Sequence, residues 1–199
     1  MNDPVFVKRY RNIEPDLSEV RRYAGFPKTG DDDPLMLSCL SELGEIRGRV
    51  CWTRFPVTRT EDGLDLGFCR TSSKSLGINL KDCSSLVLFA GTLGLDLDRL
   101  LAKYGRLSPA KALWFQAIGA AGVEALCDRF CEEIRSGEDG PVRTQPRYSP
   151  GFGDFGLEYQ PFIFSALDCQ RHIGLTLTDS FLMSPTKSVT ALVGVLDEE

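Results

Sequence analysis

The chain has 199 residues, of which 42% are apolar and 26% charged, a balance typical of one sizeable folded domain. Its net charge of −5 argues against a nucleic-acid partner, because phosphate neutralisation needs clustered Lys and Arg. The apolar runs are too short to span a membrane, and residues 1–12 lack the apolar core of a signal peptide. We therefore expect a cytoplasmic protein that does not contact a membrane.

Cysteine and histidine usage limits the chemistry. The seven cysteines are odd in number and spread along the chain, so we expect reduced thiols rather than disulfides. Cys127 and Cys131 share one face of a predicted helix, but a metal site there would need further ligands. Because His172 is the only histidine, we expect neither a metal centre nor histidine-based catalysis.

The first third of the chain is predicted to hold two short helices and several strands. Residues 16–24 and 34–46 have helical patterns, and Asp33 followed by Pro34 is a strong start signal for the second. Residues 48–70 show the apolar alternation of strands.

A buried strand over 84–94 leads into a predicted helix that ends at Gly105. The strongest helix follows. Ser108 is its predicted N-cap, Pro109 suits its first turn, and the apolar pattern continues to about Arg135.

The last third is predicted to hold a helix near 158–169 and then a β-hairpin. Residues 173–177 and 188–196 are the two predicted strands, joined by a long loop. With no internal repeat and no convincing linker, we expect one α+β domain over 1–199, with helices packed on a mainly antiparallel sheet.

The letters G-x-G-x-x-G occur at Gly151, Gly153 and Gly156. A dinucleotide-binding loop needs a strand immediately before these glycines, whereas residues 142–148 are polar and contain a proline. We therefore expect the glycines to allow close approach of the backbone to a different ligand.

Two charged residues stand out. Glu124 is the only charge in the apolar stretch 112–127, where a buried carboxylate requires a partner. It is either a structural ion pair, an exposed edge position or a ligand contact. Arg147 precedes the glycines and is either a surface residue or a holder of a carboxylate or phosphate.

Three segments together resemble the activation domain of cobalamin-dependent methionine synthase. Residues 147–152 are similar to its R-x-x-x-G-[FY] signature, and residues 174–194 to its L-x-L-T-[DE]-S-x-x-M-x-P-x-x-S-V segment. Residues 124–135 are similar to its E-A-φ-A-[DE] helix, where φ is apolar. The resemblance is clearest over 84–196 and implies a stand-alone reactivation subunit.

The resemblance also implies site residues. Arg147 would pair with the methionyl carboxylate of S-adenosylmethionine, and Glu124 would be a polar ligand contact. The backbone of Ser149, Pro150 and Gly151 would border the adenine.

Phe152 replaces the tyrosine that the family usually has, which removes a hydroxyl but keeps a ring. The loop that would face the corrinoid contains Met183, Pro185 and Ser188. The family also uses an acidic residue near its N-terminus, for which Asp16 and Asp33 are both candidates.

The implied activity is reductive methylation of cob(II)alamin held by a separate methionine synthase or other corrinoid protein. A flavodoxin or ferredoxin-type protein would supply the electron, and no side chain of this chain would act as a catalytic acid or base. The alternatives are a reactivation or docking module for another corrinoid methyltransferase, and a non-catalytic S-adenosylmethionine sensor.

Overall fold

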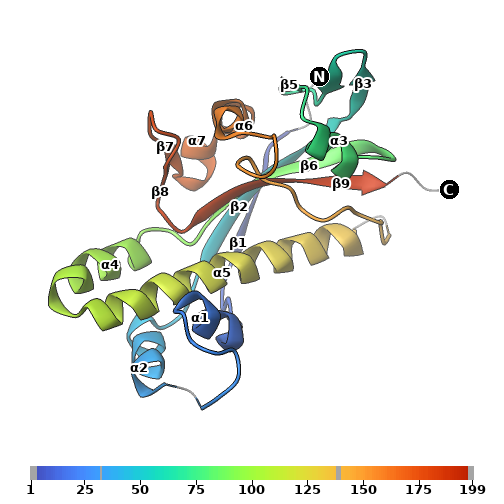
Figure 1. The fold of residues 1–199 in the computed structure, drawn as a ribbon. Helices are drawn as coiled ribbons and strands as arrows, with labels where there is room; N and C mark the ends of the chain where they lie inside the picture. The colour runs from blue at the N-terminus through green and yellow to red at the C-terminus, as the bar shows by residue number, and fades with distance from the viewer. Residues whose placement is uncertain (1–3, 32, 138–139, 197–199) are drawn as a thin grey trace.

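The computed structural model describes residues 4–31, 33–137 and 140–196. A four-stranded antiparallel sheet lies at its centre, with helices on both faces (Figure 1). The predicted α+β architecture with a mainly antiparallel sheet is therefore confirmed. In spatial order the strands are β1 (Phe6–Tyr10), β2 (Gly48–Pro56), β6 (Cys83–Thr92) and β9 (Ser188–Leu196).

The first face of the sheet is covered by the long helix α5, which has three shorter helices beside it (Figure 1). Leu126 of α5 is fully buried and packs over two sheet glycines, Gly48 and Gly91. A Cβ atom at Gly48 would lie 2.9 Å from Leu126 Cδ2, so this glycine lets the helix approach the sheet closely. The four helices are α1 (Leu17–Tyr23), α2 (Pro34–Leu43), α4 (Asp96–Leu107) and α5 (Pro109–Ser136).

The second face of the sheet packs against a separate apolar core, which includes Phe155, Ile163 and Leu167. Three helices and a 3₁₀ turn cover this face: α3 (Lys74–Asn79), η1 (Leu157–Tyr159), α6 (Gln160–Leu167) and α7 (Cys169–Ile173). A small sheet adds β3 (Thr58–Thr60), β4 (Gly63–Asp65) and β5 (Arg70–Thr71).

The predicted helix starts are confirmed, whereas two predicted ends are wrong. Asp33 accepts hydrogen bonds from the N–H groups of α2, and Ser108 accepts one from Lys111 N. Helix α2 ends short of residue 46, because Gly44 adopts a left-handed φ of 68°. Helix α4 continues past Gly105 to Leu107.

The expected C-terminal hairpin is wrong in its pairing. β7 (Thr176–Leu177) pairs with β8 (Met183–Ser184), inside the segment expected to be a loop, whereas β9 pairs with β6. The helix expected over 158–169 is also divided, because Asp168 adopts a left-handed φ of 42° between α6 and α7.

Two expectations concerned disulfides and membrane-spanning segments. The seven cysteines are thiols rather than disulfides, and each is buried except the half-buried Cys69. Within the described residues, none of the helices combines the length and apolar character that crossing a membrane requires.

Candidate functional site

A pocket of about 810 Å³ lies beside β9, between α5 and α6. Most of its lining residues come from two loops, 146–152 and 181–186, and from the start of β9. Two lining side chains carry opposite charges, those of Glu124 and Arg147. The lining residues are Asn79, Glu124, 146–150, Phe152, Leu157, Gln160, 181–183, Thr186 and 188–190.

The loop that carries Arg147 is fixed to the outer edge of β9. Tyr148 N donates to Leu192 O at 2.8 Å, and Leu192 N donates to Tyr148 O at 2.8 Å. Because the direction of backbone groups alternates along a strand, the N–H and C=O of Thr190 also point to this outer edge. Thr190 lines the pocket, so a strand edge contributes neutral backbone groups to it.

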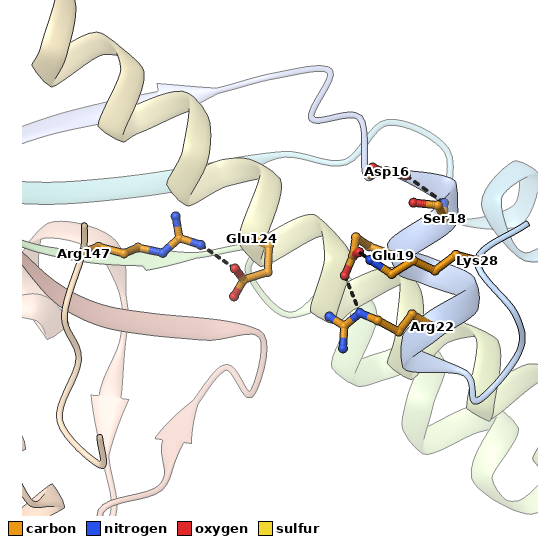
Figure 2. Close-up of polar contacts among 7 residues, drawn as sticks. All are labelled: Asp16, Ser18, Glu19, Arg22, Lys28, Glu124 and Arg147. Atoms are coloured by element: carbon orange, nitrogen blue, oxygen red, sulfur yellow. Dashed lines mark hydrogen bonds and ion pairs between the residues drawn. The ribbon is translucent and has the colours of Figure 1, made fainter. Parts of the chain in front are cut away.

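Arg147 reaches from this loop to α5, where it bonds to two carboxylates, of which Figure 2 draws that of Glu124. Its Nη2 donates to Glu124 Oε2, and its Nη1 donates to Asp128 Oδ1 at 2.5 Å. The two acidic residues are one helical turn apart and so share a face of α5. Figure 2 shows the Arg147 and Glu124 side chains pointing toward each other.

The electrostatics of this cluster leave an excess of negative charge. Burial acts against the charged form of Arg147, but the hydrogen bond to Asp128 and the charge of Glu124 outweigh it and raise its pKa. Arg147 therefore remains a cation between two carboxylates. The Glu124 side chain is 46% exposed and paired with Arg147, so the apolar stretch 112–127 does not bury this carboxylate fully.

The glycine-rich loop is anchored to the start of α3 by Asp154. This carboxylate accepts from Ser73 Oγ at 2.5 Å, Lys74 N at 2.8 Å and Ser75 N at 3.1 Å. The Ser73 and Ser75 hydroxyls, with the Lys74 N–H, hold the pKa of Asp154 well below its usual range. The loop segment that lines the pocket is thus held from outside the pocket.

Two glycines, Gly153 and Gly151, shape the loop through contacts with the protein itself. Gly153 has a φ of 55°, and a Cβ there would lie 2.4 Å from Ser75 Oγ and 2.7 Å from Tyr148 Oη. Gly151 has a φ of 97°, and its N–H donates to Phe155 O at 2.7 Å. The close approach at Gly153 is therefore to protein atoms, and the expected approach of the loop backbone to a ligand stays a prediction.

Most residues of the expected ligand site meet in the pocket. Glu124, Arg147, Ser149, Pro150 and Phe152 all line it. Gly151 is absent from the lining and lies in a turn, where its N–H donates to Phe155 O. The Phe152 ring is 65% exposed at the rim, where its nearest ring partner is Tyr148, with centroids 6.4 Å apart.

The expected corrinoid-facing loop lies on the other side of the pocket. Met183 and Ser188 line the pocket, whereas Pro185 does not. Thr186 N donates to Asp98 Oδ2 of α4 at 2.9 Å, and the buried Lys187 donates through Nζ to Gln116 O of α5 at 3.2 Å.

Both N-terminal candidates serve as helix caps. Asp16 accepts from Ser18 N at 2.7 Å at the start of α1 (Figure 2), and Asp33 does the same for α2. Neither is among the pocket-lining residues. Within the described residues, no group of three or more His, Cys, Asp or Glu side chains is placed to hold a metal ion.

Several polar residues of the site were not anticipated, among them Asp128, Asn79 and Gln160. Asp128 shares Arg147 with Glu124, and Asn79 and Gln160 line the pocket from α3 and α6. Asn79 Nδ2 donates to Pro146 O at 3.1 Å, while its buried Oδ1 has no partner among the described residues. The acidic position of the E-A-φ-A-[DE] motif could have indicated Asp128, but no sequence signal marks the two amides.

Comparisons with known proteins identify the fold. A scan against protein-family models and a search of curated proteins found no match. Among solved structures, the chain is similar to the crystal structure of the MetH reactivation domain bound to AdoHcy. The TM-score is 0.69 at 15% identity, covering 100% of this chain and 81% of that chain. The chain therefore has the fold of the methionine synthase activation domain, as the three sequence segments implied.

Proposed function

We propose that the chain binds S-adenosylmethionine in the pocket beside β9 and supports reductive reactivation of a cobalamin-dependent methionine synthase. The observation that carries this proposal is the pairing of Arg147 and Glu124 at a pocket in this fold. The structurally similar reactivation domain is bound to AdoHcy, the product that S-adenosylmethionine leaves after methyl transfer.

The pocket suits this ligand in size and charge. Its volume of about 810 Å³ is within the range of small-molecule sites. The methionyl end of S-adenosylmethionine carries a carboxylate, which suits the Arg147 guanidinium, and an ammonium group, which suits the Glu124 carboxylate. The excess negative charge of the Arg147 cluster also favours a ligand that carries a sulfonium cation.

The chemistry demands little of this chain beyond binding. Cobalamin, bound to a separate corrinoid protein and reduced by one electron from a flavodoxin or ferredoxin-type donor, supplies the nucleophile. The methyl group would pass from the sulfonium sulfur to that nucleophile, and the electron pair of the broken bond would stay on sulfur in the neutral thioether of AdoHcy. Glu124 and Arg147 would fix the methionyl end, and the loops 146–152 and 181–186 would exclude water.

The loop with Met183 and Ser188 is the proposed face toward the corrinoid. Hydrogen bonds from Thr186 to Asp98 and from Lys187 to Gln116 O attach this loop to α4 and α5. Such attachment would present a preformed surface to the partner, which reduces the ordering cost of docking.

Reconstituted methyl transfer tests the proposal. The chain would be mixed with a purified corrinoid protein in the cob(II)alamin state, reduced flavodoxin and S-adenosylmethionine labelled in its methyl group. We expect label on cobalt and the absorbance of methylcobalamin, both dependent on the chain and both reduced in Arg147→Ala. Saturable ligand binding without methyl transfer to any corrinoid protein tried would instead support a sensor or docking module.

A further inference from the structure

The amide of Gln160 is a buried polar group in the pocket wall. Gln160 is the first residue of α6 and is 3% exposed. Its Oε1 accepts a hydrogen bond of 2.8 Å from Thr190 Oγ1 of β9, and Thr190 is 1% exposed. Both residues line the pocket, so a fixed amide joins the helix and the strand at its wall.

The other half of this amide is free to bind a ligand. Among the described residues, no acceptor is bonded to Gln160 Nε2. Asn79 Oδ1 is the only side-chain N or O atom of these residues that is both fully enclosed and without a partner, so Gln160 Nε2 is not fully enclosed. Nε2 therefore keeps contact with open space, which at this residue is the pocket. A donor that faces a pocket can bond to water there or to a ligand acceptor that takes the place of the water.

The amide oxygen of Gln160 faces Thr190. It accepts the Thr190 hydroxyl proton, which leaves the NH₂ group on the other side of the amide. The observed orientation satisfies Thr190 and directs the NH₂ group away from it. Gln160 thus presents a donor, not an acceptor, to the pocket.

We propose that Gln160 Nε2 donates a hydrogen bond to a neutral acceptor in the nucleoside part of the ligand, a ring nitrogen or a ribose oxygen. This inference rests on the proposed binding of S-adenosylmethionine. The charged Glu124 and Arg147 serve the methionyl end, whereas Gln160, Val189 and the Thr190 backbone are uncharged. A neutral donor beside a neutral strand edge matches a nucleoside better than a carboxylate.

Calorimetry on the full chain tests this inference with AdoHcy and with 5′-methylthioadenosine, which keeps the nucleoside and lacks the amino-acid part. Gln160→Met is close to glutamine in length and removes only the amide. We expect this substitution to weaken the binding of both ligands by about 3- to 10-fold, which corresponds to the loss of one neutral hydrogen bond. Gln160→Glu keeps an acceptor for Thr190 but replaces the NH₂ donor with an acceptor. It should weaken the binding of both ligands at least as much as Gln160→Met does.

Two control variants separate a ligand contact from a structural role. Thr190→Val removes the hydroxyl but keeps the donor, so its loss of affinity should be smaller than that of Gln160→Met. Arg147→Ala should weaken the binding of AdoHcy and leave the affinity for 5′-methylthioadenosine unchanged. Thermal denaturation of each variant, without ligand, reports any loss of fold.

The outcomes are distinct. Gln160 variants that stay folded and bind both ligands like the wild type would overturn this inference alone. So would a wild type that binds AdoHcy but not 5′-methylthioadenosine. A wild type that binds neither AdoHcy nor S-adenosylmethionine would overturn the proposed function and this inference together.

Discussion

Neutralising the two carboxylates that contact Arg147, one at a time, should weaken ligand binding in one variant and not in the other. Glu124 and Asp128 lie one turn apart on α5, and both accept a hydrogen bond from the same guanidinium. Only Glu124 lines the pocket. Glu124→Gln and Asp128→Asn are therefore a matched pair that differ in access to the ligand.

The magnitudes follow from exposure. The Asp128 side chain is 68% exposed, so its ion pair contributes about 0–1 kcal/mol to stability. A ligand carboxylate would have to displace it from Arg147, so Asp128→Asn should leave affinity unchanged or tighten it up to about fivefold. Glu124→Gln removes a charge-assisted contact to the ligand ammonium, and should weaken binding by about 1.5–3 kcal/mol.

Calorimetric titration of S-adenosylmethionine into both variants at one pH and ionic strength gives these affinities directly. Thermal denaturation without ligand should show both variants within about 1 kcal/mol of the wild type. A tenfold or greater loss of affinity in Asp128→Asn would refute this assignment of roles. An unchanged affinity in Glu124→Gln would refute it equally.

Three further predictions concern the loop and the core. Gly153→Ala forces a Cβ to 2.4 Å from Ser75 Oγ at a left-handed φ, and should lower the unfolding free energy by about 1–3 kcal/mol in denaturant titrations. The pKa of Asp154 is depressed by folding, so its stabilisation is present at neutral pH and lost as pH falls. Melting temperatures of Asp154→Asn should lie below the wild type at pH 7, and the difference should shrink below about pH 4. Leu126→Ala empties a fully buried position and should cost about 2–5 kcal/mol of unfolding free energy.

Local signals account for the parts of the fold that the sequence predicts well. Asp33 with Pro34 and Ser108 with Pro109 mark helix starts within a few residues, and both starts are confirmed. Strand pairing, by contrast, depends on residues that are distant in the sequence. The alternation near Leu175 reflects burial in the second core, and β9 finds its partner β6 about a hundred residues away.

The residues of the site also fall into those that the sequence indicated and those that it did not. The resemblance brought Glu124 and Arg147 together although they lie far apart in sequence, and their contact agrees with it. Gln160 and Asn79 carry no such signal, because a polar residue at a helix end looks the same whether it faces solvent or a pocket. Turn glycines and ligand-approach glycines cannot be told apart from the sequence alone, so the expected ligand contact at Gly151 stays a prediction.

The most direct test of the central claim is calorimetric titration of S-adenosylmethionine into the wild type and Arg147→Ala, each alone and with a corrinoid protein. Saturable binding by the wild type, weakened by about 1.5–3 kcal/mol in Arg147→Ala, is the predicted result. A wild type with no saturable binding in either condition, or a folded Arg147→Ala with unchanged affinity, would contradict a ligand site centred on Arg147.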